Sequence, residues 1–240
     1  MASTAEERPR EARKPGRIHV AGVMDLAEAE LLIECGVEHV GFPLVLGHHA
    51  EDLSHEAAAA IVARLADRSS FFLITYLATA AEIIALCRRL KVAAVQLHGP
   101  IAAGELRRLR AAWPELYVIK SLIVRGDNLD ALAEEVGRFA PVVDAFITDT
   151  FDAETGACGA TGKLHDWAVS ARLVELSPRP VILAGGLNPN NVREAIIAVQ
   201  PAGVDVHTGV EGADGRKQRG LVERFVAEAQ AGLALQMLKS

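Results

Sequence analysis

Two glycine-containing segments near the C-terminal end of the chain have the pattern of an anion-binding site. They are residues 184–191 (AGGLNPNN) and residues 204–212 (VDVHTGVEG), and each adjoins a short apolar run and precedes a helical pattern. Paired glycines such as Gly185 and Gly186 let backbone N–H groups approach an anion closely, and the start of a helix adds a favourable dipole. Ordinary strand-to-helix turns are the alternative. We expect a phosphate group to bind here.

The segments that must position these loops alternate between short apolar runs and amphipathic stretches. The apolar runs are hydrophobic at nearly every residue, which is typical of parallel strands covered by helices. Capping-box pairs, Asp25 with Glu28 and Thr79 with Glu82, begin two of the intervening helices. The expected strands are 17–21, 39–44, 71–76, 93–97, 117–122, 143–148, 180–183 and 202–206.

Eight strand–helix units in this order predict a single (β/α)8 TIM barrel, with a doubly wound open sheet as the alternative. The barrel domain is expected to span residues 17–240. Residues 1–16 are polar, with prolines and mixed charges, and are expected to form a disordered N-terminal extension. In such barrels the functional groups lie at the C-terminal ends of the strands. The groups expected around this mouth are Ala21, His98, Asp149, His207 and the two glycine loops.

The composition excludes several other classes of protein. The formal net charge is −6, which does not suggest a nucleic-acid-binding surface. The cysteines, Cys35, Cys87 and Cys158, are odd in number and irregularly spaced, which argues against a disulfide framework and against a cysteine-based zinc site. No apolar run approaches the roughly 18 residues of a membrane span. We therefore expect a cytoplasmic protein without nucleic-acid or membrane partners.

Four motifs together resemble the phosphoribosylanthranilate isomerase family of the tryptophan pathway. They are residues 96–99 (QLHG), 159–167 (GATGKLHDW), 184–192 (AGGLNPNNV) and 204–211 (VDVHTGVE). The family performs an Amadori rearrangement of an aminoaldose phosphate to an aminoketose phosphate, without a cofactor. The resemblance therefore implies a cofactor-independent isomerase that acts on a small phosphorylated sugar-type substrate.

The resemblance also implies roles for individual residues. Asp149 matches the family's general acid, at the end of strand six. Three loops are implied to hold the substrate phosphate. Their expected contacts are Gly159, Thr161, Gly162, Gly185, Gly186, Thr208 and Gly209. The other candidate substrate contacts are His98, Asp205, His207 and His49.

The sequence departs from the family's pattern at two places. The family's first strand ends Lys-Ile-Cys-Gly, and the cysteine is the general base, whereas residues 19–22 (HVAG) put Ala21 in that place. The family also carries an arginine after strand two that meets the anthranilate carboxylate, but residues 46–52 (LGHHAED) contain no arginine. An alanine cannot take a proton, and loss of a positioned base lowers a rate by about 10²–10⁴.

His19 is the first candidate for a replacement base. It lies two residues before Ala21, so both side chains share one strand face at roughly 6.6 Å, and a histidine has a suitable pKa. The alternative is a buried histidine in the barrel core. Cys158 is a second candidate base; the alternative is that it is an unreactive cysteine in a loop. His48 and His49 could replace the missing positive charge, or could simply be solvated.

Three further features carry less specific signals. Lys120, in strand five, could form a Schiff base with a carbonyl substrate, although the family carries a lysine in the same context without such chemistry. Inward histidine and carboxylate side chains could also form a metal site. Its ligands would come from four strands with no short spacing between them in the sequence, so we expect no metal. The mixed charge run 214–219 is expected to be a solvated helix entry. The members of the conceivable metal set are His19, His98, Asp149, Asp205 and His207.

Three functions are compatible with this pattern. The first is an isomerase of the phosphoribosylanthranilate type, with Asp149 as acid and a replacement base such as His19. The second is an enzyme that acts on a different phosphorylated sugar, including a metal-assisted epimerase or lyase. The third is a non-catalytic barrel that binds a phosphate ligand. The sequence does not indicate an oligomeric state.

Overall fold

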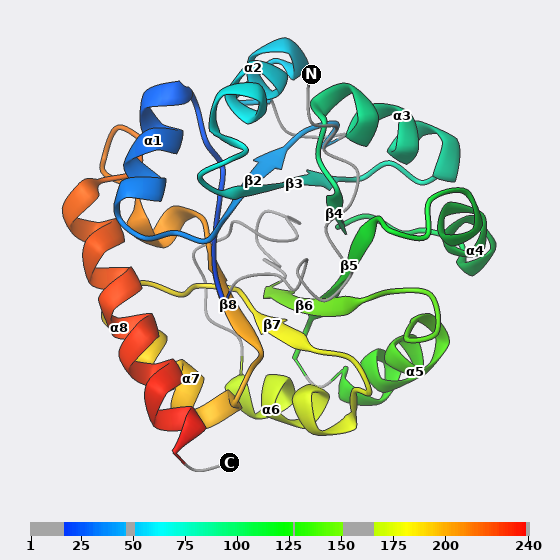
Figure 1. Cartoon of the computed structure of the whole chain (residues 1–240). Coiled ribbons are helices and arrows are strands. Elements are labelled where there is room, and N and C mark those ends of the chain that lie inside the picture. The colour runs from blue at the N-terminus through cyan, green and yellow to red at the C-terminus, as the bar shows by residue number, and fades with distance from the viewer. Residues whose placement is uncertain (1–16, 47–50, 127, 151–165, 239–240) are drawn as a thin grey trace.

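In the part of the chain that the structure describes, eight parallel strands close into a barrel and eight α-helices form a ring around it (Figure 1). This computed structural model describes residues 17–46, 51–126, 128–150 and 166–238. The strands are β1 (Ile18–Ala21), β2 (His39–Pro43), β3 (Ser70–Thr75), β4 (Ala94–Leu97), β5 (Tyr117–Val124), β6 (Ala145–Thr150), β7 (Val181–Leu183) and β8 (Gly203–Val206). The helices are α1 (Leu26–Glu34), α2 (His55–Leu65), α3 (Ala80–Leu90), α4 (Ala103–Ala112), α5 (Leu129–Phe139), α6 (Trp167–Leu176), α7 (Val192–Val199) and α8 (Arg219–Met237).

The barrel closes through pairing of its first strand with its last. In the parallel ladder between β1 and β8, His19 lies opposite Asp205 and Val20 lies opposite Val206. Every other strand pairs with the next one in the sequence, so the strand order is the order of the chain. The prediction of a single (β/α)8 barrel is therefore confirmed. The predicted extension, residues 1–16, lies outside the described residues.

The core has two compartments because alternate residues of each strand face opposite sides of the barrel wall. Outward residues such as Val20, Val40 and Val118 are buried in one large cluster between the strands and the helices. Inward residues form smaller clusters, one of which contains Ile119, Ala145, Ile147, Ile182 and Ala184. The apolar runs in the sequence reflect this burial on both faces.

The predicted helix starts are confirmed at atomic detail. Asp25 accepts the backbone N–H of Glu28 at 2.9 Å, and the Glu28 carboxylate accepts the N–H of Met24 at 2.8 Å. Thr79 accepts the N–H of Glu82 at 3.4 Å to begin α3. These bonds satisfy backbone donors that the first helical turn leaves without partners. Among the helices that the structure describes, none is long and apolar enough to cross a membrane.

Candidate active site

An acid and an imidazole meet at the C-terminal end of the barrel. Asp149 is the inward residue near the end of β6, and His98 follows β4 directly. His98 Nε2 lies 3.6 Å from Asp149 Oδ2, and the two side chains are only 8% and 12% exposed. The His98 ring also lies against Tyr76, with ring centroids 4.9 Å apart. The structure therefore brings together two of the residues that the sequence placed at the mouth.

The environment of Asp149 favours its protonated form. Burial raises the pKa of the Asp149 carboxyl, while the nearby His98 and the backbone N–H of Thr150 act in the opposite direction. That N–H donates to Asp149 Oδ1 at 2.8 Å. The net result is a pKa above the ordinary value for aspartate. A carboxyl group with a raised pKa keeps its proton to a higher pH than an isolated aspartate does, as a general acid requires.

A second buried carboxyl group, Asp205, projects inward from β8. Burial raises the pKa of Asp205 well above its usual value, and the charge of Asp149 raises it further, while Lys217 acts to lower it. Two carboxyl groups that repel one another do not both ionise readily. The mouth of the barrel therefore holds at least one proton on this pair at a pH where isolated carboxyl groups have lost theirs.

His207, which follows β8, belongs to a series of polar contacts that continues through Glu211 to Lys217. His207 Nε2 lies 3.4 Å from Glu211 Oε1. The ammonium group of Lys217 lies 2.5 Å from the same oxygen and donates to the His207 carbonyl at 3.2 Å. Burial, followed by the charge of Lys217, lowers the pKa of His207 to about 3. The imidazole is therefore neutral at neutral pH.

The expectation that residues 214–219 form a solvated helix entry is wrong for Lys217, whose side chain has no exposed surface. The segment turns back after residue 211, pairs Lys217 with Glu211 in an antiparallel bridge, and donates the Lys217 N–H to Glu28 at 2.8 Å. Arg216 forms an ion pair with Asp25. A lysine within a charged run carries no sequence signal for burial, because its partners lie on α1 and in the turn after β8.

The two glycine loops are in direct contact. Gly185 and Gly186 have φ angles of 97° and 66°, which only glycine adopts without strain. The amide of Asn191 donates to the Gly186 carbonyl at 3.0 Å and holds this turn. A Cβ atom on Gly209 would lie 1.9 Å from the carbonyl oxygen of Leu187, so the two loops touch at this glycine. Thr208 and Gly209 begin a short 3-10 helix beside the first loop.

His19 lies inside the barrel, opposite Asp205 of the neighbouring strand β8. Its side chain has no exposed surface, and its ring lies 5.0 Å from the His39 ring and 5.4 Å from the Phe72 ring. Burial lowers the pKa of His39 to about 4. This geometry agrees with the alternative that the sequence allowed, a histidine of the barrel core. The role of His19 as a base remains a prediction.

Lys120 faces away from the barrel interior. Its ammonium group lies 3.8 Å from Glu135 on α5 and donates to the Ser121 carbonyl at 2.8 Å. Burial lowers the pKa of Lys120. Because the side chain lies between the barrel wall and a helix, it cannot reach a substrate at the mouth. The structure therefore supports the structural role and not the Schiff base.

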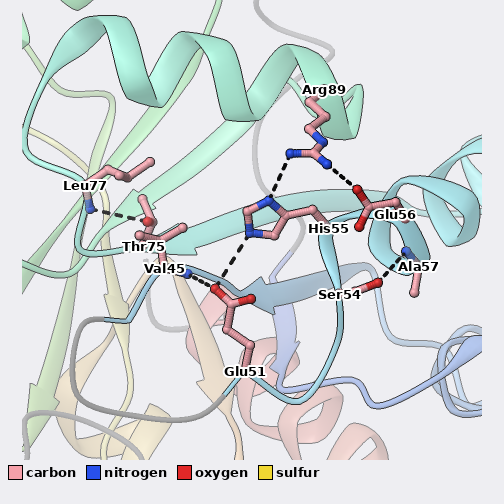
Figure 2. Close-up of polar contacts among 9 residues, drawn as sticks. All are labelled: Val45, Glu51, Ser54, His55, Glu56, Ala57, Thr75, Leu77 and Arg89. Atoms are coloured by element: carbon pink, nitrogen blue, oxygen red, sulfur yellow. Dashed lines mark hydrogen bonds and ion pairs between the residues drawn. The ribbon is translucent and has the colours of Figure 1, made fainter.

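The connection between β2 and α2 is held from both sides. Glu51 accepts the N–H of Val45 at 2.7 Å, and His55 lies 3.7 Å from the Glu51 carboxylate and 3.4 Å from Arg89 on α3 (Figure 2). Val45 has a φ of 57°, a left-handed conformation that is strained for a β-branched residue. The residues that flank positions 47–50 are thus fixed to one another and to the helical ring.

Several predicted positions lie outside the described residues. They are Cys158, Gly159, Thr161 and Gly162 in the connection after β6, and His48 and His49 in the connection after β2. Among the residues that the structure describes, no three histidine, cysteine or acidic side chains are arranged to hold a metal ion.

Comparison with known proteins identifies the family. The sequence model described as N-(5'-phosphoribosyl)anthranilate (PRA) isomerase matches residues 46–228. The chain belongs to the phosphoribosylanthranilate isomerase family. A curated family member, N-(5'-phosphoribosyl)anthranilate isomerase 2 of Methanosarcina mazei, is 36% identical over 215 residues, which cover 89% of this chain and 94% of that protein.

Solved structures of the family have the same fold. The phosphoribosylanthranilate isomerase of Thermotoga maritima superposes with a TM-score of 0.75 at 28% identity, over 89% of this chain and 98% of that one. Another isomerase of the family was solved in complex with reduced 1-(o-carboxyphenylamino)-1-deoxyribulose 5-phosphate. It superposes with a TM-score of 0.72 at 25% identity, over the same 89% and 98%.

Proposed function

We propose that this protein is an aldose–ketose isomerase that converts N-(5'-phosphoribosyl)anthranilate to the corresponding aminoketose phosphate. The observation that carries the proposal is the Asp149–His98 pair at the mouth of a barrel that belongs to the isomerase family. The substrate is inferred from the relatives, which are phosphoribosylanthranilate isomerases by name. The solved complex of one relative with a reduced ketose phosphate supports a ligand of this chemistry.

In this proposal Asp149 is the general acid. Its raised pKa keeps a proton available for the ribose ring oxygen. Transfer of that proton breaks the bond between the ring oxygen and C1′, and the nitrogen electron pair forms the C1′=N iminium. His98, 3.6 Å away, stabilises the carboxylate that remains. General-acid catalysis of this kind contributes about 10²–10⁴ in rate.

The phosphate of the substrate is proposed to bind the glycine loops. The contact between Gly209 and the Leu187 carbonyl joins the two described loops into one surface, and backbone N–H groups there can approach an anion. The proposed contacts are Gly185, Gly186, Thr208 and Gly209, together with Gly159, Thr161 and Gly162 outside the described residues. The proposed contacts to the rest of the substrate are His98, Asp205, His207 and His49.

Turnover of freshly prepared phosphoribosylanthranilate by the purified chain tests the proposal, and loss of substrate fluorescence provides the measurement. We expect turnover, and we expect Asp149→Asn to lower kcat by about 10²–10⁴ while the protein remains folded. Asn keeps the size of the side chain but cannot donate a carboxyl proton. A folded wild-type protein with no turnover would contradict the isomerase proposal.

A second candidate function is the binding of another phosphorylated sugar without this reaction. It is favoured by Ala21, which is 4% exposed and has no group that could take a proton. A thermal-shift screen of phosphosugars would reveal such a ligand, because a ligand at 100 times its Kd stabilises a protein by about 2.7 kcal/mol. The predicted cytoplasmic location stays a prediction that cell fractionation would test.

A further inference from the structure

The rearrangement also needs a base for the C2′ proton, and the pairing of β1 with β8 places an imidazole beside the strand end where Ala21 lies. The ladder aligns Val20 with Val206, so the next residues, Ala21 and His207, are neighbours across the pair. A Cβ atom on Gly22 would lie 2.0 Å from His207 Nε2. The His207 ring therefore covers the backbone of Gly22, immediately beside Ala21.

The carboxylate of Glu211 determines how the His207 ring presents its nitrogens. Glu211 Oε1 lies 3.4 Å from Nε2, and a carboxylate at this position favours the tautomer with the ring proton on Nε2 and the lone pair on Nδ1. Glu211 is itself fixed by the Lys217 ammonium at 2.5 Å. The His207 side chain is 25% exposed, which leaves part of the ring open to a ligand.

The protonation states of the mouth groups are complementary. Burial and Lys217 keep the pKa of His207 low, so that its imidazole is neutral, whereas burial raises the pKa of Asp149. A neutral imidazole and a carboxyl group that keeps its proton to a higher pH than usual provide a base and an acid in one site. Environments that shift the pKa values of two groups in opposite directions are typical of acid–base catalysis.

The other described candidates at the mouth are less suited to take the proton. His98 lies 3.6 Å from Asp149 and so serves the acid. Burial raises the pKa of Asp205 well above its usual value, so this carboxyl group ionises less readily than an isolated one. His19 has no exposed surface. His207 combines partial exposure, a neutral ring and an orienting carboxylate.

We propose that His207 is the general base of the isomerisation, with Glu211 as its positioning residue and Lys217 as the group that fixes Glu211. This inference rests on the isomerase function proposed above. His207 Nδ1 takes the C2′ proton of the iminium. The C2′–H electron pair forms the C1′=C2′ bond, and the C1′=N electron pair moves to nitrogen. The resulting enaminol becomes the ketone when C1′ gains a proton and the C2′ hydroxyl loses one.

The proton balance closes over the cycle. Asp149 gives one proton to the ring oxygen, and His207 receives one from C2′. Ketonisation adds one proton to the substrate at C1′ and removes one at the C2′ oxygen. Exchange with water then reprotonates Asp149 and deprotonates His207, so the reaction needs no oxidant, reductant or co-reactant.

His207→Gln tests the assignment, with substrate deuterated at C2′. We expect kcat to fall about 10²–10⁴-fold while KM changes by no more than about threefold, because the variant loses the proton transfer and not the binding. We also expect the deuterium isotope effect on kcat to increase as proton abstraction becomes rate-limiting. Added imidazole is expected to restore part of the activity of His207→Ala.

Two further histidine variants serve as comparisons. His55→Gln is the matched control, since the His55 side chain is 23% exposed and bridges Glu51 and Arg89 on the outer ring (Figure 2). We expect it to keep the wild-type kcat. His19→Gln tests the rival base. Loss of turnover in His19→Gln with retention in His207→Gln would overturn our assignment and leave the isomerase function standing.

A measurement on the unaltered chain covers the case in which the variants fail to fold. Diethylpyrocarbonate modification, mapped by mass spectrometry, should label His207 and not His19, and saturating aminoketose phosphate should protect His207. Labelling of His207 that the product does not block would overturn the proposal. A wild-type chain that folds but shows no turnover would contradict the isomerase function itself, and the base assignment with it.

Discussion

At the scale of single residues, the barrel uses burial to set protonation states in opposite directions. Asp149 and Asp205 have raised pKa values, and His207 and His39 have lowered ones. The sequence placed Asp149 and His98 at the same mouth, because each ends a strand there, and the structure shows that the two side chains meet. For His19 it left two possibilities open, a replacement base and a buried core histidine, because strand periodicity gives the face of a residue but not how much of that face is covered; the structure agrees with the buried position.

His39 makes the stability of the fold depend on pH. Its pKa of about 4 lies below the ordinary 6.5, so the unfolded chain binds more protons than the folded chain below pH 6.5. Stability is therefore retained above that pH and lost as the pH falls toward 4. The contribution between pH 7 and pH 5 is about 2 kcal/mol.

Urea unfolding of wild type and His39→Gln at pH 7 and pH 5 measures this contribution. We expect the variant to lose about 2 kcal/mol less than wild type between the two pH values. His207 also has a lowered pKa and adds to the loss in both proteins, so only the difference between them reports on His39. Equal losses in the two proteins would contradict the prediction.

At the scale of elements, the connections after β1 and β8 form one unit. Gly22 has a φ of 78° and lies under the His207 ring. Gly126 also has a left-handed φ, 51°, but a Cβ atom there would contact nothing within 4 Å. Alanine substitutions at these two glycines therefore distinguish the cost of backbone strain from the effect of displacing the His207 ring.

We expect Gly22→Ala to lower both stability and kcat, because the added methyl group pushes His207 out of place. Gly126→Ala should cost only the backbone term, about 1–2 kcal/mol, with little change in kcat. Steady-state kinetics and thermal melting of the two variants provide the comparison. An active Gly22→Ala enzyme would show that the position of His207 does not matter to the reaction.

The buried Lys217 is expected to contribute more to stability than an exposed cation of the same segment. Lys217→Met leaves the carboxylate of Glu211 without its ammonium partner, and loss of one partner from a buried pair costs about 3–5 kcal/mol. Arg219→Ala removes a half-exposed pair with Glu34, which is worth at most about 1 kcal/mol. Denaturant unfolding of both variants tests the difference. Similar losses would mean that the Lys217 pair is screened as a surface pair is.

At the scale of the whole molecule, the fold was predictable and the polar network was not. Eight apolar runs, each followed by a helical pattern, predict the barrel because strands covered on both sides must be hydrophobic throughout. The return of residues 212–218 onto α1 depends on Glu28, almost 200 positions earlier, and Glu28 reads in the sequence only as a capping residue. Local patterns do not contain such long-range pairs.

The whole barrel should respond to occupation of the glycine loops. We expect ribose 5-phosphate to raise the melting temperature, since a ligand at 100 times its Kd adds about 2.7 kcal/mol to the free energy of unfolding. Gly209→Val is expected to abolish the shift, because the side chain would collide with the Leu187 carbonyl. A shift of equal size in Gly209→Val would place the phosphate elsewhere.

The contact of the first strand with the last has a consequence for the order in which the protein is made. Ala21 and Gly22 are synthesised before His207, Glu211 and Lys217, which follow more than 180 positions later in the chain. Because β1 pairs only with β2 and β8, its second edge stays open in the nascent chain until β8 has been synthesised. A chain cut short before residue 203 therefore lacks both the strand that closes the barrel and the proposed base His207.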